Sequence, residues 1–312
     1  MLSRVAENIY WMARYIERAE NTARLINVTT NLILDLPRSA NVGWEPIIEI
    51  MGSEAIFHEH NDTADERDIL KFMIADLQNP GSIHSSLQGA RENARTIRDI
   101  IPRETWESVN DLFIYAKSNA QSGIARKNRH NYLQKVILGS QTITGQLAGT
   151  MYHDTAYDIL RMGRNLERAD MTTRIIDVRS ADLLEEEHEE NLTPYENIQW
   201  MSVLKSLTGY QMYRRIIQVR VRRSDVLQFL LQERKFPRAV YHTLCEVELC
   251  LENLPSHEEN VKDIKQLQKF VLGANPHKLK QEELHQFIDK LQAGLITIHN
   301  DITNSYFRRD LK

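Results

Sequence analysis

The chain has 312 residues, of which 42% are hydrophobic, enough to build the core of one large domain or two ordinary ones. It contains only 12 glycines and 8 prolines and is rich in strong helix formers, so we expect an all-α fold. A formal net charge of -4 excludes the broad basic field that gathers nucleic acid or anionic lipid, and we expect neither as a partner.

The sequence gives no sign of export or membrane insertion. It has no run of 18 apolar residues, and acidic residues interrupt the N-terminal segment where a signal peptide would be apolar. Its two cysteines, Cys245 and Cys250, should point about 140° apart on a helix, too far apart to form a disulfide. These features predict a cytoplasmic protein.

The first predicted element is a long helix that continues to about residue 35. Its apolar residues follow helical spacing at Ile9, Met12, Ile16, Ala19, Ala23 and Ile26. Pro37 and Gly43 then interrupt the chain, and a second helix should begin near Trp44 with Pro46 in its first turn.

Cap signals mark the helices that follow. The segment Asn61-Asp62-Thr63 predicts the start of a helix over 65–77, and Ser82 is expected to cap a helix that runs past Arg98 to a stop at Pro102. A helix over 104–120 should come next. We interpret 136–149 as helix although it contains β-tolerant residues and glycines.

The second half opens with another long helix, whose apolar positions are Ile159, Met162, Leu166, Ala169, Thr173 and Ile176. We interpret the acidic run 184–190 as a solvated connector, after which a helix should start at Thr193-Pro194. In the last third, breaks between helices are expected at Pro237, Pro255-Ser256, Asn275-Pro276 and Gly294.

The two long helices belong to an internal repeat. Identical residues 150 positions apart are Arg14/Arg164, Glu17/Glu167, Arg18/Arg168, Ala19/Ala169, Thr22/Thr172, Arg24/Arg174 and Ile26/Ile176. Further blocks match in the same order: Trp44 with Trp200, and 68–87 with 225–244 at a shift of 157. These blocks predict a single large helical bundle built from two duplicated, pseudo-twofold related halves, about 1–150 and 151–312.

The repeated Glu-Arg pairs are the first candidate site. The two long helices that carry these pairs are apolar over much of their circumference, so other helices should cover most of their surface. Their charged side chains must then find partners. In a functional interpretation, Glu17 and Glu167 are catalytic acids or bases beside a cleft. The arginines that would bind a carboxylate or phosphate there are Arg14, Arg18, Arg164 and Arg168. In a structural interpretation, ion pairs form within the first helix among Arg14, Glu17, Arg18, Glu20 and Arg24, and a Glu-Arg network between the halves fixes how they dock.

A second candidate site lies in the segment ARENARTIR. Arg91, Arg95 and Arg98 recur at i, i+4 and i+7 and should form one positive stripe, with Asn93 between them and Trp106-Glu107 after the helix break. The stripe suits an anion or an acidic partner surface, and a solvated helix face is the alternative. The second half has no matching stripe, so docking between the halves does not require it.

We expect no metal site and no cofactor. The histidines of His58-x-His60 and His153-Asp154 have no further ligands at metal-binding spacing. The glycines fit neither a P-loop nor a dinucleotide fingerprint, so the chain is not expected to bind ATP by itself.

The duplicated Glu-Arg helices, the ARENARTIR stripe with Trp106-Glu107, and the segment LERADMTTRIIDVR together make the chain resemble the bacterial alpha-E domain family over essentially its whole length. The resemblance implies that the family's Glu-Arg motif falls on Glu17-Arg18 and Glu167-Arg168. It also implies that the Arg-rich helix of the family falls on Arg91, Glu92, Asn93, Arg95 and Arg98. Members of this family are typically encoded or fused with circularly permuted ATP-grasp proteins and transglutaminase-like peptidases.

The resemblance therefore implies an ATP-grasp ligase-like partner, and a transglutaminase-like protein as a further one. We expect an accessory or substrate-binding subunit of an ATP-grasp-dependent amide or peptide ligation system, with an amino acid or peptide as substrate. Two alternatives stay open: a stand-alone enzyme that acts through Glu17 or Glu167, and a purely structural scaffold. The sequence also leaves open whether the chain forms a homo-oligomer.

Overall fold

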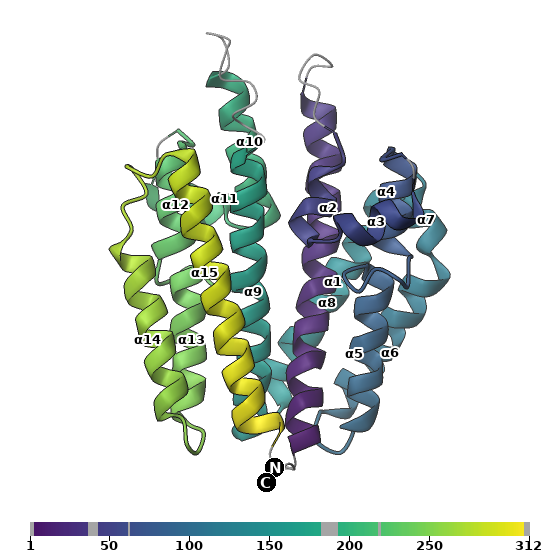
Figure 1. Ribbon diagram of the computed structural model, residues 1–312. Coiled ribbons are helices and arrows are strands. Elements are labelled where there is room, and N and C mark those ends of the chain that lie inside the picture. The colour runs from purple at the N-terminus through teal and green to yellow at the C-terminus, as the bar shows by residue number, and fades with distance from the viewer. Residues whose placement is uncertain (1–2, 37–42, 62, 182–192, 218–219, 309–312) are drawn as a thin grey trace. The chain divides into compact units, whose positions relative to one another are not determined.

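The computed structural model describes residues 3–36, 43–61, 63–181, 193–217 and 220–308, and the regular elements within these ranges are all helical (Figure 1). The all-α expectation is confirmed. The helices of the first 150 residues are α1 (Ser3–Asp35), α2 (Pro46–Met51), α3 (Glu54–His60), α4 (Glu66–Ile74), α5 (Ile83–Thr96), α6 (Arg103–Ser118), α7 (Ala120–Ile124) and α8 (Arg129–Thr150).

The remaining helices are α9 (Thr155–Ala181), α10 (Thr193–Ser206), α11 (Tyr210–Ile217), α12 (Arg223–Gln232), α13 (Val240–Glu252), α14 (Glu258–Gly273) and α15 (Gln281–Ile302), followed by the π-helical turn η2 (Thr303–Phe307). None of the helices described has the length and apolar character needed to cross a membrane.

The chain divides into two compact units. The first consists of Met1–Asn27, Ile47–Arg164 and Thr303–Lys312, and the second of Val28–Pro46 and Asn165–Ile302. Helices α1 and α9 therefore each contribute residues to both units. This division departs from the predicted halves at residues 28–46, 151–164 and 303–312, which belong to the other unit.

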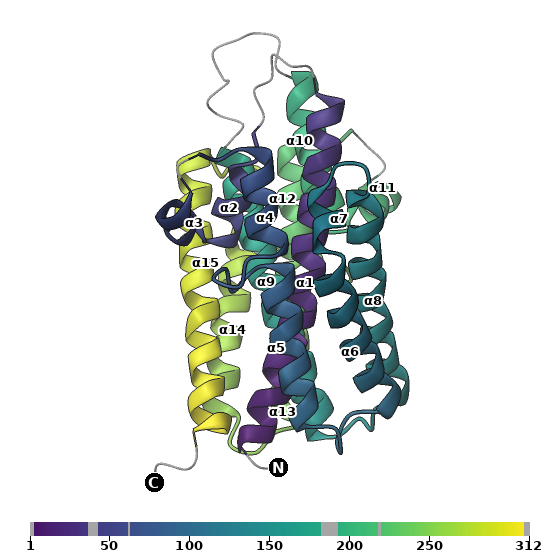
Figure 2. The same cartoon turned by 90° about the vertical axis from the view of Figure 1, so that its right-hand side faces the viewer.

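In the first unit, α6 packs against α5 on one side and α8 on the other, and α4 contacts α5 and α7 (Figure 2). The predicted apolar seam of α1 is buried at all six of its positions. A buried arginine also links two helices here, because Nη2 of Arg129 on α8 lies 2.7 Å from Oε1 of Glu66 at the start of α4. Tyr10 of α1 is fully buried, and its ring lies 5.2 Å from that of Phe307.

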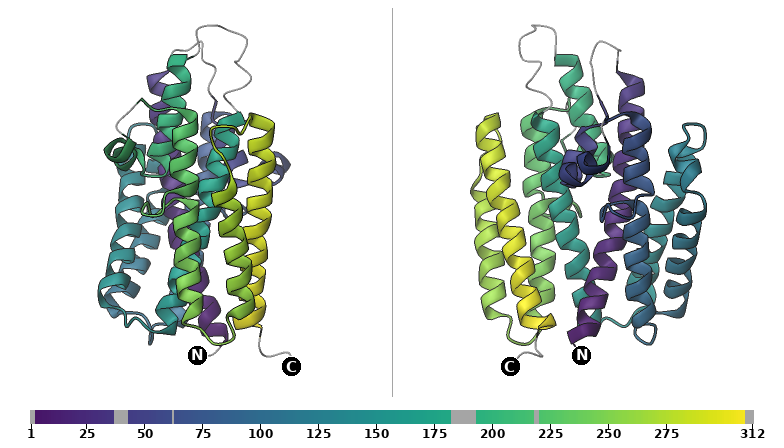
Figure 3. Two further views of the ribbon diagram at one scale, coloured as in Figure 1. Left: turned by 90° about the vertical axis from the view of Figure 1, so that its left-hand side faces the viewer. Right: turned by 45° about the vertical axis from the view of Figure 1, so that its right-hand side comes forward.

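In the second unit, α13 and α14 pack side by side, α15 lies against α14, and α12 contacts α13 (Figures 1 and 3). The predicted seam positions of α9 that belong to this unit, from Leu166 to Ile176, are all buried. Trp200 of α10 is 1% exposed and is among the largest fully buried side chains.

Helix ends follow the local sequence signals with some differences. Ser82 caps α5 as expected, since its Oγ accepts a hydrogen bond from the amide of Ser85 at 3.0 Å. The cap of α4 is Asp65, whose carboxylate accepts a hydrogen bond from the amide of Asp68. The expected cap segment was Asn61-Asp62-Thr63, of which Asp62 lies outside the described residues. Helix α5 ends at Thr96, before Arg98 rather than beyond it.

The expected break at Gly294 is wrong, because α15 continues through this residue. A Cβ at position 294 would lie 2.6 Å from Cδ1 of Leu267 on α14. Glycine therefore serves here to let two packed helices approach closely, which is a different role from ending a helix. The expectation of helix over 136–149 is confirmed by α8, and the predicted connector 184–190 lies outside the described residues.

Register-equivalent residues of α1 and α9 make the same hydrogen bond. Oγ1 of Thr22 donates to the carbonyl of Gly81 at 3.1 Å, and Oγ1 of Thr172 donates to the carbonyl of Arg238 at 2.9 Å. The donors are 150 positions apart and the acceptors 157, the same shifts that relate the repeated sequence blocks. The duplication stays a prediction, and this pair of hydrogen bonds agrees with it.

Gly163 on α9 supplies a test of helix packing in the first unit. A Cβ at this position would clash with the backbone oxygen of Tyr10 on α1, and that oxygen cannot move aside as a side chain can. We therefore expect Gly163→Ala to lower the free energy of unfolding by about 1 to 3 kcal/mol in urea denaturation.

The matched control is Gly145→Ala in the exposed face of α8, where an added Cβ meets no atom within 4 Å. That change should leave stability the same or raise it by up to about 1 kcal/mol, because alanine favours helix. Equal stability of Gly163→Ala and wild type would contradict the close approach of α9 to α1.

Candidate functional site

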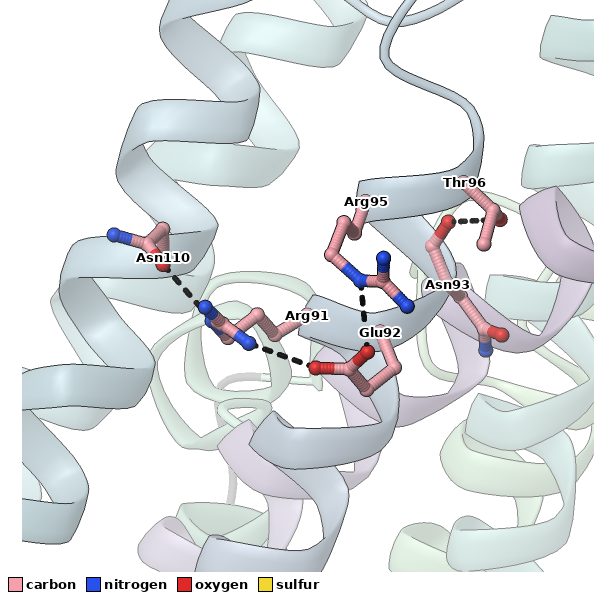
Figure 4. A network of polar contacts seen from close by, with 6 residues as sticks. All are labelled: Arg91, Glu92, Asn93, Arg95, Thr96 and Asn110. Carbon is pink, nitrogen blue, oxygen red and sulfur yellow. Dashed lines mark hydrogen bonds and ion pairs between the residues drawn. The ribbon is translucent and has the colours of Figure 1, made fainter.

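The arginine segment of α5 faces α6 through a set of polar contacts (Figure 4). Nε of Arg91 donates to Oδ1 of Asn110 on α6 at 2.9 Å, and Nη1 of Arg91 donates to Oε1 of Glu92 at 2.7 Å. Nε of Arg95 donates to the other oxygen of Glu92 at 2.9 Å. One carboxylate thus lies between two guanidinium groups, and one of these groups also links α5 to α6.

Glu92 is held in its ionised form by its neighbours. The hydrogen bond from Arg95, together with the charges of Arg95 and Arg91, keeps the pKa of the Glu92 carboxyl below its ordinary value. The Asn93 side chain points away from this carboxylate (Figure 4). The predicted stripe is therefore a mixed network in which one acid offsets part of the positive charge.

Aromatic rings of α6 lie beside the arginines. The guanidinium carbon of Arg91 is 5.3 Å from the ring centre of Phe113 and 5.9 Å from that of Trp106. The guanidinium of Arg98, just beyond the end of α5, lies 4.0 Å from the ring centre of Trp106. We call the set Arg91, Arg95, Arg98, Trp106 and Phe113 the α5–α6 arginine surface.

Phe113 and Asn110 were missed as site residues by the sequence reasoning. A signal for them exists, since Trp106, Asn110 and Phe113 recur at i, i+4 and i+7 on α6, the same spacing as the arginines beside them. Two helices joined by a short connection pack side by side. The same residue spacing on both helices therefore predicts that the two rows of side chains lie next to each other. Lys117 extends the α6 stripe by one turn, with Nζ 6.0 Å from the Phe113 ring centre.

Arg98 has the geometry of an anion-binding group. In the described part of the chain it makes no ion pair, and its residue is exposed. Stacking on the indole occupies a face of the guanidinium and leaves the N–H groups, which lie in its plane, free to bind a carboxylate or phosphate through two parallel hydrogen bonds. Arg95, with its side chain 53% exposed, can contribute a second positive charge.

The Glu-Arg motif of α1 is mostly buried. Glu17 is 2% exposed. Nη1 of Arg14 donates to the hydroxyl of Tyr10 at 3.4 Å and its guanidinium lies 5.0 Å from the Trp11 ring centre, while the guanidinium of Arg18 lies 5.6 Å from the ring centre of Tyr15. Both arginines therefore have aromatic neighbours one turn or less away on their own helix.

A buried ion pair lies one turn further along α1, between two of the residues that the structural interpretation pairs within the helix. Nη2 of Arg24 lies 2.7 Å from Oε1 of Glu20, whose side chain is 4% exposed. Nε2 of Gln141 on α8 donates to the same oxygen at 3.4 Å. The carboxylate of Glu20 thus connects α1 to α8 inside the first unit.

The corresponding motif of α9 repeats part of this pattern. Glu167 is 1% exposed, and Nε of Arg174 donates to both carboxylate oxygens of Asp170 at 3.0 Å. Asp170 and Arg174 are the counterparts of Glu20 and Arg24 in the sequence repeat. Nε of Arg164 is buried and has no hydrogen-bond partner among the residues that the structure describes.

The two Glu-Arg motifs belong to different compact units, Glu17-Arg18 to the first and Glu167-Arg168 to the second. A cleft shared by both motifs stays a prediction. Carboxylates with so little exposed surface favour a role in holding helices together, because a substrate has to reach the group that acts on it.

Comparisons with known proteins place the chain in a family. A family model described as a predicted alpha-helical domain with a conserved ER motif matches residues 1–307. The curated relatives include uncharacterized proteins of Mycobacterium bovis and of two strains of Mycobacterium tuberculosis, each 20% identical over 327 residues.

These alignments cover 96% of this chain and 36% of each relative. The chain thus spans about a third of the length of the curated relatives it matches. No solved structure matches it.

The stacking of Arg98 on Trp106 can be measured by a double-mutant cycle. Arg98→Ala, Trp106→Ala and the double variant should give a coupling energy of about 0.5 to 1 kcal/mol in chemical denaturation, since this is the strength of an exposed cation–π contact. The control is the cycle of Arg95 with Trp106, because Arg95 contacts Glu92 instead and its coupling should be near zero. Equal coupling in both cycles would show that Arg98 has no special contact with the indole.

The structural role of the buried glutamates predicts a loss of stability when either loses its charge. Glu17→Gln and Glu167→Gln should each lower the free energy of unfolding by about 1 to 3 kcal/mol, because hydrogen bonds to a buried charged group are weakened. Glu7→Gln, at an exposed position of α1, is the matched control and should change little. Variants that keep wild-type stability would instead favour a functional role for these two carboxylates.

Proposed function

The chain belongs to the Alpha-E family, and from this premise we propose that it is an accessory or substrate-binding subunit of an ATP-grasp-dependent amide or peptide ligation system. In this proposal the α5–α6 arginine surface binds either the ATP-grasp partner or the carboxylate of an amino-acid or peptide substrate. A transglutaminase-like protein is a further partner. The proposal locates the protein in the cytoplasm, where ligation by such a partner has access to ATP.

The observation that carries the proposal is the stacking of Arg98 on Trp106 at 4.0 Å. Stacking fixes the plane of the guanidinium before anything binds, so less side-chain entropy is lost on binding. The free edge of the group matches the planar shape of a carboxylate. Ligation substrates carry a carboxylate that must be held in place, and an acidic partner surface presents the same group.

The contacts of Arg91 indicate that the α5–α6 arginine surface is preorganised before a ligand binds. Its hydrogen bond to Asn110 at 2.9 Å ties α5 to α6, and its hydrogen bond to Glu92 at 2.7 Å, within α5, holds the guanidinium in place beside Phe113. Arg91 is occupied in this way, whereas Arg95 bonds Glu92 through Nε and its side chain is 53% exposed, so Arg95 and Arg98 are the residues placed to contact a ligand. We therefore assign Arg91 a positioning role and the other two a binding role.

The length of the relatives supports a role as one part of a larger system. In the mycobacterial relatives the matched region makes up 36% of the protein, so this fold works beside other sequence there. The family resemblance points to an ATP-grasp protein as the partner.

The alternative of a stand-alone enzyme gains less support. It needs Glu17 or Glu167 to contact a substrate, yet these residues are 2% and 1% exposed. The remaining alternative, a structural scaffold, accounts well for the Glu-Arg motifs but leaves the exposed α5–α6 arginine surface without a role.

The proposal is tested by measuring binding of the purified chain to a purified ATP-grasp protein from the same genome by biolayer interferometry. The double variant Arg95→Ala/Arg98→Ala should weaken the complex at least about tenfold, since each charge-assisted hydrogen bond lost is worth about 1.5 kcal/mol or more. A short peptide with a free C-terminal carboxylate should bind the same surface, whereas its amide should not.

Arg67→Ala is the matched control, because Arg67 is an exposed arginine on α4 of the same unit. It should leave the affinity unchanged, and melting temperatures should show that all variants are folded. The proposal fails if Arg95→Ala/Arg98→Ala binds the partner and the peptide as wild type does, or if wild type binds neither.

A further inference from the structure

Two helices of the second unit bring together three side chains of types that can bind metal ions. Asp177 lies near the C-terminal end of α9, and His285 and Asp289 lie one turn apart on α15. Oδ1 of Asp177 is 2.9 Å from Nδ1 of His285, and Oδ2 of Asp289 is 3.6 Å from Nε2 of the same ring. One ligand atom from each residue can be chosen so that all three lie within 4.8 Å of one another.

The charges around the imidazole favour a cation. Glu282, one turn before His285 on α15, adds a third carboxylate that acts electrostatically on the ring. Asp177 and Asp289 also repel each other electrostatically. The arginines on either side of Asp177 along α9 are bonded to other residues, since Nε of Arg174 donates to Asp170 at 3.0 Å and Nη2 of Arg179 donates to Oγ1 of Thr29 at 2.9 Å. A positive ion at this position would relieve the repulsion between the carboxylates.

We propose that Asp177, His285 and Asp289 form a binding site for a divalent transition-metal ion of the Zn²⁺ type, which joins α9 to α15. One imidazole nitrogen and two carboxylate oxygens are ligands that suit Zn²⁺ and its neighbours better than Mg²⁺ or Ca²⁺, which take mainly oxygen. The site lies outside the α5–α6 arginine surface and does not depend on the function proposed for it.

The two carboxylates contact different nitrogens of the His285 ring, and an imidazole binds an ion through one nitrogen, so side chains have to rotate before all three ligands reach the same ion. Ligand atoms around tetrahedral zinc lie roughly 3.3 Å apart, given metal–ligand bonds of about 2.0 to 2.1 Å. The side chains of His285 and Asp289 are 53% and 60% exposed, so they can rotate to close the remaining distance. Asp177, at 18% exposed, supplies the fixed ligand.

A neighbouring hydrogen bond already holds the two helices at the required separation. Nε2 of Gln281, one turn before His285 on α15, donates to Oγ of Ser180 on α9 at 2.9 Å. The ligands therefore come from helices that are joined without the metal, which lowers the cost of assembling the site. Three protein ligands leave one position of a tetrahedral ion open, so a water molecule should complete its coordination.

The test is isothermal titration of the full chain, freed of metal by a chelator, with ZnCl₂ as the probe. Wild type should bind one Zn²⁺ that His285→Gln and Asp289→Asn each weaken at least about tenfold, and Zn²⁺ should raise the melting temperature of wild type but of neither variant. MgCl₂ should not reproduce the shift. Asp289→Asn keeps the test valid if His285→Gln fails to fold, because Asp289 is exposed.

Two histidine variants serve as controls, since the chain has 11 histidines that can bind zinc weakly. His277→Gln removes an exposed histidine of the same unit, and His188→Gln removes the one in the acidic run 184–190. Both should keep the wild-type affinity. The proposal is overturned if wild type binds no zinc, if all variants bind it equally, or if His188→Gln abolishes binding while His285→Gln does not.

Discussion

The deep burial of α1 and α9 is the constraint on which the rest of the structure depends. Both helices bury their apolar seams and a set of polar side chains as well, including Glu17, Glu20, Asn21, Thr22, Asn165, Glu167, Thr172, Thr173 and Ser180. A buried polar group without a partner costs free energy, so each of these residues restricts what can pack beside it. The Thr22 and Thr172 hydroxyls, for example, each fix the backbone just ahead of α5 or α13.

Most of the fold could be predicted from the sequence because helical periodicity is a local signal. The seams of α1 and α9, the cap at Ser82 and the helix over 136–149 all follow from residues close together in the chain. Gly294 could not be interpreted in this way. Its role depends on Leu267 of another helix, and a glycine that lets helices approach looks in sequence like a glycine that ends one.

The candidate site residues show the same contrast between local signals, which the sequence reveals, and contacts between distant helices, which it does not. The arginines of 91–98 stood out because they recur along one segment, but their partners on α6 come from a different helix and carry a weaker signal. The cluster of Asp177 and His285 spans 108 positions, so no spacing motif could reveal it. For Glu17 and Glu167, the sequence predicted burial and the need for partners, while their burial in the structure favours the structural interpretation.

The contact between Arg98 and Trp106 also has an optical consequence. The chain has four tryptophans: Trp200 and Trp44 are 1% and 9% exposed and so are shielded from any ligand in solution, whereas Trp11 and Trp106 are partly exposed, and replacing Trp11 by phenylalanine leaves Trp106 as the partly exposed indole. Trp106 is half-buried and carries a cation on its ring at 4.0 Å. A carboxylate that binds this guanidinium changes the electric field across the indole, and with it the wavelength and yield of its fluorescence. The protein therefore contains its own spectroscopic reporter of occupancy, and no dye has to be attached to the surface being probed.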